Sequence, residues 1–382
     1  MTVINDIFVM KSKVFSGEQS LKKLAEIHGT KACIVSDQMM EKLGYLGQVV
    51  DLLQSGGIST SVYTGVKPDP SVSIVAEALQ VYWESGADVL LALGGGSVID
   101  TAKGVLYFAR QYALEKDEPF VKPSFVAIPS TSGTGSEVTD FSVITAGGDK
   151  MVIVDNFIAP DIAILDSTLT KQLPNKIVVD TGMDVLTHAL EAYVSTKATD
   201  FTDALAEKAV QLVFAHLETL YHDPADAEAR DRVQNASCMA GMAFTNAGLG
   251  IIHSMSHAFG GTFHIAHGRV NSLLLEVVME YNANLGGKTI DRVCERYARL
   301  ASLLHLPART AREGTVSLIQ AIGKLKRSIG IENGIRELGV DQDAFNEALS
   351  RMARNAMADR CTPTSPRQPT EEELEHIYRK SF

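Results

Sequence analysis

Four side chains in two pairs have the types and spacing to bind one metal ion: Asp184 and His188, then His253 and His267. Asp184 and His188 are four residues apart, so on a helix they share one face and can chelate one ion. His253 and His267 are fourteen residues apart, which is ~21 Å of rise on an unbroken helix and too far for one ion. The glycine pair at 260–261 can break the helix and let the chain fold back. One carboxylate and three imidazoles suit a divalent transition metal and leave a coordination position for a substrate oxygen.

A further histidine, His257, lies one helical turn after His253. Four ligands are already named, so we interpret His257 as a neighbour of the metal site that transfers a proton, because an imidazole titrates near neutrality. The alternative is a hydrogen-bonded helix residue with no part in the chemistry. His264 belongs either to the same site or to the turn beside it, and His216 is expected to be structural.

The composition is that of a globular protein. At 382 residues the chain exceeds one typical hydrophobic core, so two domains are expected. No apolar run is long enough to cross a membrane, and the net charge of −11 argues against a nucleic-acid partner. The N-terminus lacks the pattern of a secretion signal. The four cysteines, at 33, 238, 294 and 361, form no CxxC pair and are expected to be reduced and packed, which predicts a cytoplasmic protein.

The order of the predicted elements divides the chain near Pro174. Before it, short β-rich runs alternate with amphipathic stretches at 39–54 and 71–84, which predicts a parallel sheet covered on both faces. After it, the apolar spacing is helical and strand signals vanish. We therefore expect an α/β domain at 1–175 and an all-helical domain at 176–382. The predicted strands are at 31–36, 59–63, 88–93, 124–128, 141–145, 152–154 and 163–165.

A glycine-rich turn follows the buried strand predicted at 88–93. Three glycines at 94–96 and Ser97 lead into a helix, whose first N–H groups and positive dipole end favour a pyrophosphate. The spacing is not GxGxxG, because Ile99 occupies the position of the last glycine. The alternative is a plain tight turn in which Ser97 and Asp100 form a capping pair.

Two further strand ends carry residues suited to a dinucleotide. The loop at 130–137 is rich in glycine and hydroxyl groups, and with the first loop it would surround a diphosphate and ribose. Asp37 follows the strand at 31–36, where a carboxylate can hold ribose hydroxyls and repel a 2′-phosphate, which favours NAD over NADP. The alternatives are a surface loop for the first and a helix N-cap for Asp37.

Four motifs together resemble the iron-containing (group III) alcohol dehydrogenases along essentially the whole chain. They are Gly-Gly-Gly-Ser-x-x-Asp at 94–100, Pro-Ser-Thr-Ser-Gly-Thr-Gly-Ser-Glu at 129–137, Gly-Met-Asp-Val-Leu-Thr-His-Ala-Leu-Glu-Ala-Tyr at 182–193 and His-Gly-Arg-Val-Asn at 267–271. The chain looks most similar to short-chain propanol and ethanol dehydrogenases, some of which serve bacterial microcompartments. Val270 and Glu276 depart from the family, which commonly has a small residue and a proline there.

The resemblance implies an N-terminal dinucleotide-binding domain, a helical metal-binding domain and an active site in the cleft between them. It matches Asp184, His188, His253 and His267 with the family's iron ligands, and His257 with an additional histidine of the cleft. The positions that it matches with the NAD site are Asp37, Asp69, Gly95, Gly96, Ser97, Asp100, Thr131, Ser132, Thr134 and Lys150.

The implied reaction is the NAD(H)-dependent interconversion of a small primary alcohol and its aldehyde by direct hydride transfer, with Fe²⁺ or Zn²⁺ as the metal. An alternative is the reduction of a functionalised or anionic aldehyde, such as lactaldehyde or sulfoacetaldehyde. Arg269 and Arg360 could neutralise the charge of an anionic one. Arg269 is equally interpretable as a structural residue. A polyol dehydrogenase would line the cleft with more polar groups than Phe141, Val143, Phe244, Leu249 and Phe259. A homodimer or larger homo-oligomer is expected, located in the cytoplasm or inside a bacterial microcompartment.

Overall fold

The computed structural model describes residues 8–147 and 149–382, and these form two compact units. The first unit spans residues 10–173, and the second spans 174–382 and includes Phe8 and Val9. The ring of Phe8 stacks on Phe201 with centroids 5.5 Å apart, and the backbone N–H of Val9 donates to the Asn246 side chain at 2.8 Å. The start of the described chain therefore packs with helices far along the sequence.

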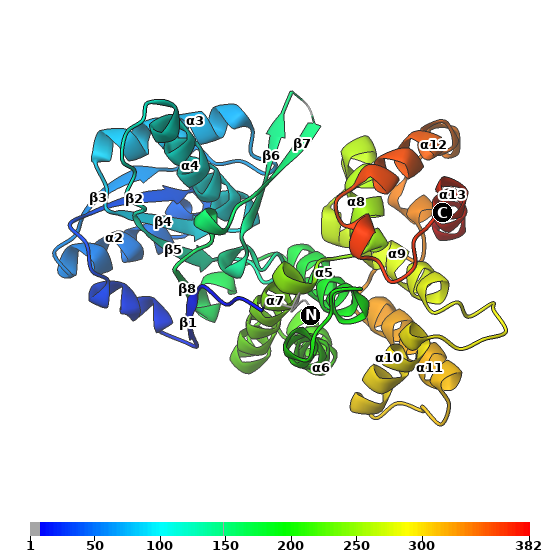
Figure 1. The fold of residues 1–382 in the computed structure, drawn as a ribbon. Helices are drawn as coiled ribbons and strands as arrows, with labels where there is room; N and C mark the ends of the chain where they lie inside the picture. Colours follow the sequence, from blue (N-terminus) through cyan, green and yellow to red (C-terminus); the bar gives the residue numbers. More distant parts are fainter. Residues whose placement is uncertain (1–7, 148) are drawn as a thin grey trace, which may run out of the picture. The chain divides into compact units, whose positions relative to one another are not determined.

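A parallel sheet forms the centre of the first unit (Figure 1). The strand order is β1-β8-β5-β4-β2-β3, and β6 and β7 form a separate antiparallel hairpin. The predicted strands are all present, whereas β1 was not predicted, because its residues are at most half-buried and carry little apolar signal. The strands are β1 (Lys13–Ser16), β2 (Lys31–Ser36), β3 (Ser59–Tyr63), β4 (Val89–Gly94), β5 (Ser124–Pro129), β6 (Phe141–Ala146), β7 (Asp149–Val154) and β8 (Ile162–Leu165).

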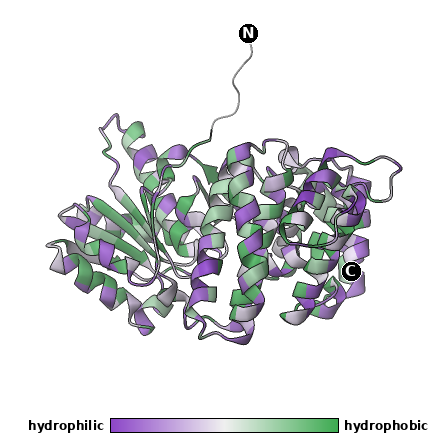
Figure 2. Ribbon diagram, turned by 90° about the horizontal axis from the view of Figure 1, so that it is seen from below, coloured by the Kyte–Doolittle hydropathy of each residue, from purple (hydrophilic) through white to green (hydrophobic). Residues whose placement is uncertain are grey.

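Helices cover both faces of this sheet, as predicted. Along β4, Leu90 and Ala92 pack into the core beneath α3 and α4, while Leu91 and Leu93 pack into the core beneath α2. Both faces of the strand are buried, which explains its unbroken apolar sequence and the green strands of Figure 2. The helices of this unit are α1 (Gln38–Lys42), α2 (Tyr45–Ser55), α3 (Val72–Ser85) and α4 (Gly96–Glu115).

The second unit is helical throughout its described residues, which confirms the change of character after Pro174. Helix α5 is its centre and packs against α6, α7 and α9, while α8 packs against α9 and α12. None of the helices within residues 8–147 and 149–382 combines the length and the hydropathy needed to span a bilayer. The helices are α5 (Asn175–Val194), α6 (Asp200–His222), α7 (Ala227–Ala247), α8 (Ile251–Phe263), α9 (His267–Asn282), α10 (Arg292–Leu303), α11 (Ala311–Ser328), α12 (Gln342–Ala358) and α13 (Glu371–Ser381).

Short 3-10 helices connect several of these elements. They are η1 (Ser20–Glu26), η2 (Ser136–Val138), η3 (Asn156–Ile158), η4 (Ser167–Thr170), η5 (Ile335–Leu338) and η6 (Thr362–Thr364).

Two local predictions were wrong, and one alternative, the capping pair of Ser97 and Asp100, is excluded. The stretch 39–54 is two helices, because Gly44 adopts a left-handed conformation with φ 78° between them. The glycine pair at 260–261 does not end α8, which continues to Phe263 and stops at His264, a left-handed residue with φ 56°. Ser97 and Asp100 form no capping pair, since α4 begins at Gly96 and its N-cap, Gly95, offers no side chain.

Candidate metal centre and cofactor loops

Asp184 and His188 lie on one face of α5, as their spacing predicts. Asp184 Oδ1 is 3.9 Å from the Nε2 atom of His188. Both side chains are almost fully buried, at 7% and 6% exposure. His188 is held in place because its ring lies between those of Phe244 and His253, with centroids 4.4 and 4.5 Å away. The first half of the predicted ligand set is therefore packed in place by contacts that need no ion.

The chain reversal after α8 brings His267 to the same carboxylate. Asp184 Oδ1 is 3.6 Å from His253 Nε2 and 3.8 Å from His267 Nε2. Helix α9 begins at His267, directly against α5. A Cβ atom on Gly268 would lie 2.1 Å from the backbone oxygen of Asp180, so only glycine fits there. The turn at His264 and the close approach at Gly268 together deliver the fourth side chain.

The donor atoms of Asp184, His188 and His253 are spaced as ligands of one divalent ion, and His267 approaches the same carboxylate. Atoms bound ~2.1 Å from a tetrahedral metal lie ~3.4 Å from one another, and the three Nε2 atoms lie 3.6–3.9 Å from Asp184 Oδ1. The donor atoms of Asp184, His188 and His253 all lie within 4.8 Å of one another. The amide nitrogen of Asn271, a partly positive group, reaches Asp184 Oδ1 at 2.7 Å and His267 Nε2 at 3.0 Å. The carboxylate oxygen and the ring nitrogens thus surround a point at which a positively charged group is stabilised.

The protonation of the cluster also suits a cation. Burial opposes the charge of Asp184, but His188, His253 and His267 hold the pKa of its carboxyl well below the usual range. Partial burial, aided by the neighbouring histidines, holds the pKa of His267 well below its usual value in spite of Asp184. Burial also opposes the charge of His253, yet Glu191 and Asp184 raise its pKa to about 9. A divalent ion would take the place of that proton.

Glu191 orients His253 from outside the ligand set. Its Oε2 atom is 2.6 Å from His253 Nδ1, and its two oxygens accept the backbone N–H groups of Gly250 and Ile252 at 2.9 and 2.7 Å. One carboxylate thus accepts backbone N–H groups at the start of α8 and also fixes the His253 ring through Nδ1, the nitrogen that faces away from Asp184. A carboxylate behind a ligand histidine sets the tautomer and the basicity of the ligand nitrogen.

His257 lies beside the cluster and is fixed in the same way. Its Nδ1 atom is 2.8 Å from Asp359 Oδ2, and its ring stacks on His267 with centroids 5.0 Å apart. Asp359 is itself held by the backbone N–H of Cys361 at 2.8 Å. The side chains of His257 and His267 are 34% and 36% exposed, in contrast to the buried remainder of the cluster. A small molecule can reach the cluster from this edge.

In the first unit, the three predicted cofactor segments end neighbouring strands. Asp37 follows β2, residues 95–97 follow β4, and residues 130–135 follow β5, and these strands pair as β2-β4-β5. The carboxyl edge of a parallel sheet is where doubly wound folds bind nucleotides. Helix α4 starts there with no side-chain cap, which leaves backbone N–H groups of its first turn for a phosphate.

The two loops pack against each other through small residues. A Cβ atom on Gly96 would lie 2.7 Å from Thr134 Cγ2, and one on Gly95 would lie 3.4 Å from the Thr131 side chain. Gly96 is therefore required by the approach of the second loop. Asp37 is an N-cap, since its Oδ1 accepts from the backbone N–H groups of Met39 and Met40 at 2.8 and 3.0 Å.

Three other predicted cofactor residues bond within the protein. Asp100 accepts from the Ser136 hydroxyl at 2.7 Å and from the backbone N–H of Val143 at 3.1 Å, which ties α4 to the second loop and to β6. Burial raises the pKa of its carboxyl. Asp69 and Lys150 form an ion pair with each other. Thr131, Ser132 and Thr134 lie in the second loop as predicted, Ser97 lies in the first turn of α4, and their contact with a cofactor stays a prediction.

Known proteins match both units of this chain. A model of the family "Iron-containing alcohol dehydrogenase" matches residues 11–167, and a model of "Fe-containing alcohol dehydrogenase family, C-terminal" matches residues 178–382. The chain belongs to the iron-containing alcohol dehydrogenase family. It is accordingly an oxidoreductase enzyme, and membership of the family implies a metal ion and a nicotinamide cofactor.

Relatives of this family member include several alcohol dehydrogenases. The NADPH-dependent butanol dehydrogenase of Clostridium saccharobutylicum is 37% identical over 97% of this chain and 96% of its own length. The 1-propanol dehydrogenase of Citrobacter freundii is 38% identical, with 94% and 95% covered. The aldehyde-alcohol dehydrogenase of Streptococcus pneumoniae serotype 4 is 37% identical over 98% of this chain, which spans only 45% of that longer protein.

Solved structures of the family share the fold. The iron-containing alcohol dehydrogenase of Thermococcus thioreducens superposes with a TM-score of 0.90 and 35% identity, covering 98% of this chain and 99% of that one. Sulfoacetaldehyde reductase from Bifidobacterium kashiwanohense, in complex with NAD+, has a TM-score of 0.85 and 25% identity, with 98% of each chain covered.

One residue of this family member, Phe259, differs from its predicted surroundings, and Arg269 takes the structural role that was one of its two interpretations. Phe259, expected to line a cleft, is fully buried and packs against Phe263 and Tyr378. Arg269 is structural, since it bonds to Asp180 and Glu332 at 2.5 Å each.

Both residues that depart from the family pattern make contacts inside the helical unit. Val270 is buried in the core, and Glu276 pairs with the buried Lys326 at 2.5 Å. All four cysteines are buried and reduced, as predicted.

Three residues of the site were not predicted from the sequence. Glu191 is seven residues after Asp184 on the same face of α5, and Asn271 is four residues after His267 on α9, so helical spacing held a signal for both. Asp359 follows α12, more than a hundred residues after His257. No local pattern connects those two.

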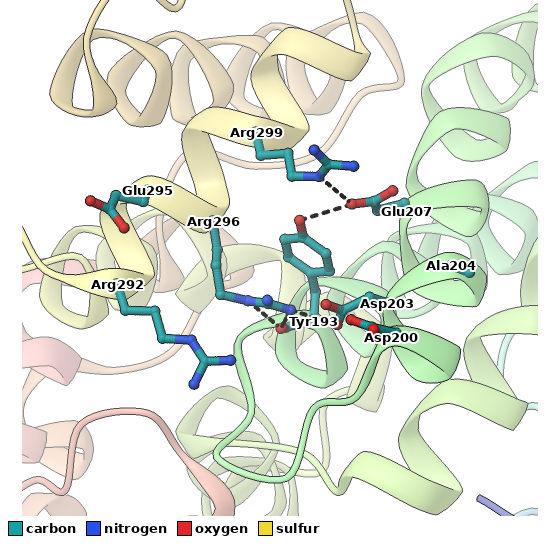
Figure 3. Close-up of a pocket in the computed structure, with 9 residues that line it drawn as sticks. All are labelled: Tyr193, Asp200, Asp203, Ala204, Glu207, Arg292, Glu295, Arg296 and Arg299. Atoms are coloured by element: carbon teal, nitrogen blue, oxygen red, sulfur yellow. Dashed lines mark hydrogen bonds and ion pairs between the residues drawn. The ribbon is translucent and has the colours of Figure 1, made fainter.

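A hollow in the helical unit is lined by a network of ion pairs (Figure 3). Arg296 bonds to Asp203 at 2.5 Å and lies over the ring of Tyr193, and Glu207 accepts from Arg299 at 2.8 Å. These contacts join α10 to α5 and α6. None of the predicted site residues lines this hollow, whose lining is Tyr193, Asp200, Asp203, Ala204, Glu207, Arg292, Glu295, Arg296 and Arg299.

Proposed function

We propose that this enzyme interconverts a small primary alcohol and its aldehyde with NAD(H), using one divalent metal held by Asp184, His188, His253 and His267. The observation that supports it most is the approach of three Nε2 atoms to Asp184 Oδ1, at 3.6–3.9 Å. The relatives named as butanol and 1-propanol dehydrogenases support the class of substrate.

A divalent metal in such a site polarises a carbonyl oxygen or lowers the pKa of an alcohol, and a nicotinamide accepts or supplies the hydride. The work of the chain's own residues is to hold these groups in place. Glu191 and Asn271 fix the ligand side chains, so the donor atoms need little rearrangement on binding. Phe244 gives His188 an apolar neighbour, which keeps water from that side of the cluster.

We assign the proton transfer to His257. Because Asp359 accepts a hydrogen bond from Nδ1, the neutral ring presents Nε2 as its proton acceptor. Burial opposes the charge of Asp359, but its hydrogen bonds with His257 and Cys361 hold the pKa of its carboxyl well below the usual range. An anionic Asp359 stabilises the imidazolium that forms when His257 takes up the proton of an alcohol.

The proposed preference for NAD over NADP rests on Asp37. Its Oδ1 caps α1, and its Oδ2 would lie 3.2 Å from a Cβ atom on Gly94, over the glycine turn. A carboxylate there accepts from ribose hydroxyls and repels a 2′-phosphate. The relative from Clostridium is named as NADPH-dependent, and the sulfoacetaldehyde reductase from Bifidobacterium was solved with NAD+, so both cofactors occur among the similar proteins.

The variant Asp37→Asn separates charge from structure, because asparagine caps a helix as well as aspartate does. We expect a higher kcat/KM for NADH than for NADPH in the native enzyme, and a narrower gap in the variant with unchanged Tm. Equal kcat/KM for the two cofactors in the native enzyme would refute the preference.

The second candidate substrate is an anionic aldehyde, favoured by the similarity to sulfoacetaldehyde reductase. Against it, the buried guanidinium of Arg269 is already neutralised by Asp180 and Glu332. An aldehyde panel with NADH decides between the two, on enzyme reconstituted anaerobically with Fe²⁺ and, in parallel, with Zn²⁺. We expect propanal and butanal to exceed sulfoacetaldehyde in kcat/KM, with the uncharged lactaldehyde as a control for polarity, and Fe²⁺ to give the higher activity. A higher kcat/KM for sulfoacetaldehyde would establish the second candidate.

A cytoplasmic location, enclosure in a microcompartment and a homodimeric or larger assembly belong to the same proposal. They rest on the sequence and on the similarity to 1-propanol dehydrogenases. Light scattering of the purified enzyme tests the assembly.

A further inference from the structure

A second group of metal-ligand atoms lies next to the proposed catalytic cluster. A ring nitrogen of His257, a carboxylate oxygen of Asp359 and the sulfur of Cys361 lie within 4.8 Å of one another. None of the three belongs to the four proposed ligands. We propose that this trio is a second, thiophilic metal site, and that a zinc-like ion bound there inhibits the enzyme without displacing the catalytic metal.

Two hydrogen bonds already draw the three donor atoms together. His257 Nδ1 is 2.8 Å from Asp359 Oδ2, and the Cys361 thiol also bonds to the Asp359 carboxylate. The backbone N–H of Cys361 and the Ser254 hydroxyl fix the other oxygen of Asp359, at 2.8 and 3.3 Å. A divalent ion takes the place of these two bonds: the thiol proton of Cys361 is released to solvent, and the ring proton of His257 moves from Nδ1 to Nε2.

The chemistry of the donors selects the ion. A thiolate, an imidazole and one carboxylate favour Zn²⁺ or Cd²⁺ over Mg²⁺ and Ca²⁺, which prefer oxygen ligands. The anionic Asp359 and Cys361 balance the two positive charges of the ion. This balance matters because both side chains are largely buried, where an uncompensated charge is costly. The 34% exposure of the His257 side chain leaves a path for the ion from solvent.

The inhibition follows from the role of His257, and this step rests on the proposed function. An ion on His257 Nδ1 leaves the ring proton on Nε2, so this nitrogen can no longer accept the proton of an alcohol. The His257 ring stacks on the His267 ring, whereas His267 approaches Asp184 Oδ1 through its own Nε2 atom. An ion on Nδ1 of His257 therefore need not displace any of the four proposed ligands. Turnover should therefore stop while the catalytic metal stays bound.

The experiment titrates Cd²⁺ into the Fe²⁺-loaded enzyme under anaerobic conditions. Elemental analysis after gel filtration counts both metals, the ultraviolet charge-transfer band reports a cadmium–thiolate bond, and NADH oxidation with butanal reports turnover. We expect one bound Cd²⁺ per chain, retained iron, a thiolate band and loss of activity. The variant Cys361→Ser should lose the band and the inhibition and keep its iron.

The matched control is Cys294→Ser, at a buried cysteine whose sulfur contacts the Thr315 hydroxyl at 3.3 Å. It should behave as the native enzyme does. A band that survives in Cys361→Ser, or iron released in step with cadmium uptake, would overturn the second site. Cadmium bound with its band but without inhibition would support the site and overturn the proton-transfer role of His257, so the two failures are distinguishable.

Discussion

The helical unit and the α/β unit build their candidate sites from opposite materials. Around Asp184, buried charged and aromatic side chains converge on one point, and Glu191 and Asn271 hold them there. After β4 and β5, glycines and small hydroxyl residues leave room for a ligand and offer backbone groups. The metal centre depends on side chains that contact one another, and the cofactor loops depend on glycines whose lack of a side chain leaves space. Deleting a group should therefore damage the metal centre most, and adding one should damage the cofactor loops most.

The largest effect should come from deleting a ligand. His267→Ala leaves three donors and opens the cluster to water, so bound metal and activity should both fall to background while the helical core stays packed. Elemental analysis and circular dichroism measure the two properties. A variant with full metal content would remove His267 from the ligand set.

Deleting the proton-transfer group should cost turnover and leave the metal. General acid–base assistance is typically worth ~10² to 10⁴ in rate, so His257→Gln should lower kcat by that factor with its metal retained. The control is His264→Asn, at an exposed left-handed residue where asparagine is tolerated. An unchanged kcat in His257→Gln would make the residue a structural one, and lost metal would make it a ligand.

Removing charge behind a ligand should have a smaller effect. Mutating such outer partners typically costs ~10- to 100-fold in metal affinity, so Glu191→Gln should weaken metal binding by about that factor and keep the fold. Competition with a chelator measures the affinity. An affinity equal to that of the native enzyme would show that Glu191 only caps α8.

Adding one methyl group should be enough to damage the cofactor loops. In Gly96→Ala the new Cβ would lie 2.7 Å from Thr134, and relieving the overlap costs ~1–3 kcal/mol. We expect the Kd of NADH to rise ~10-fold, with the metal content unchanged.

The control for this variant is Gly47→Ala in α2, where a Cβ atom meets nothing within 4 Å. It should leave the Kd of NADH unchanged. Equal effects of the two substitutions would mean that the close packing of the loops is not what shapes the cofactor site.

The same contrast explains what the sequence could predict. Asp184 and His188 are visible as a helical pair, and β2 and β3 begin and end at the predicted residues, because both patterns are local. The predicted position of the chain reversal, at the glycine pair 260–261, was wrong. A glycine pair indicates a break, whereas His264 adopts the left-handed conformation that ends the helix.

Long-range contacts were beyond local patterns. The bond between His257 and Asp359 joins residues 102 apart, and the fit of Gly268 against Asp180 depends on how α9 crosses α5. Asp100 shows the same limit in the other unit, because its partners on β6 and η2 are set by tertiary packing. Residue types indicated these sites, and only the fold showed which atoms meet.

The central claim is that one divalent metal lies among Asp184, His188, His253 and His267. Crystals of enzyme loaded anaerobically with Fe²⁺, measured on both sides of the iron absorption edge, test it most directly. We predict one anomalous peak per chain, ~2.0–2.2 Å from Asp184 Oδ1 and the three Nε2 atoms. A peak elsewhere, or one that excludes any of these four side chains, would contradict the claim.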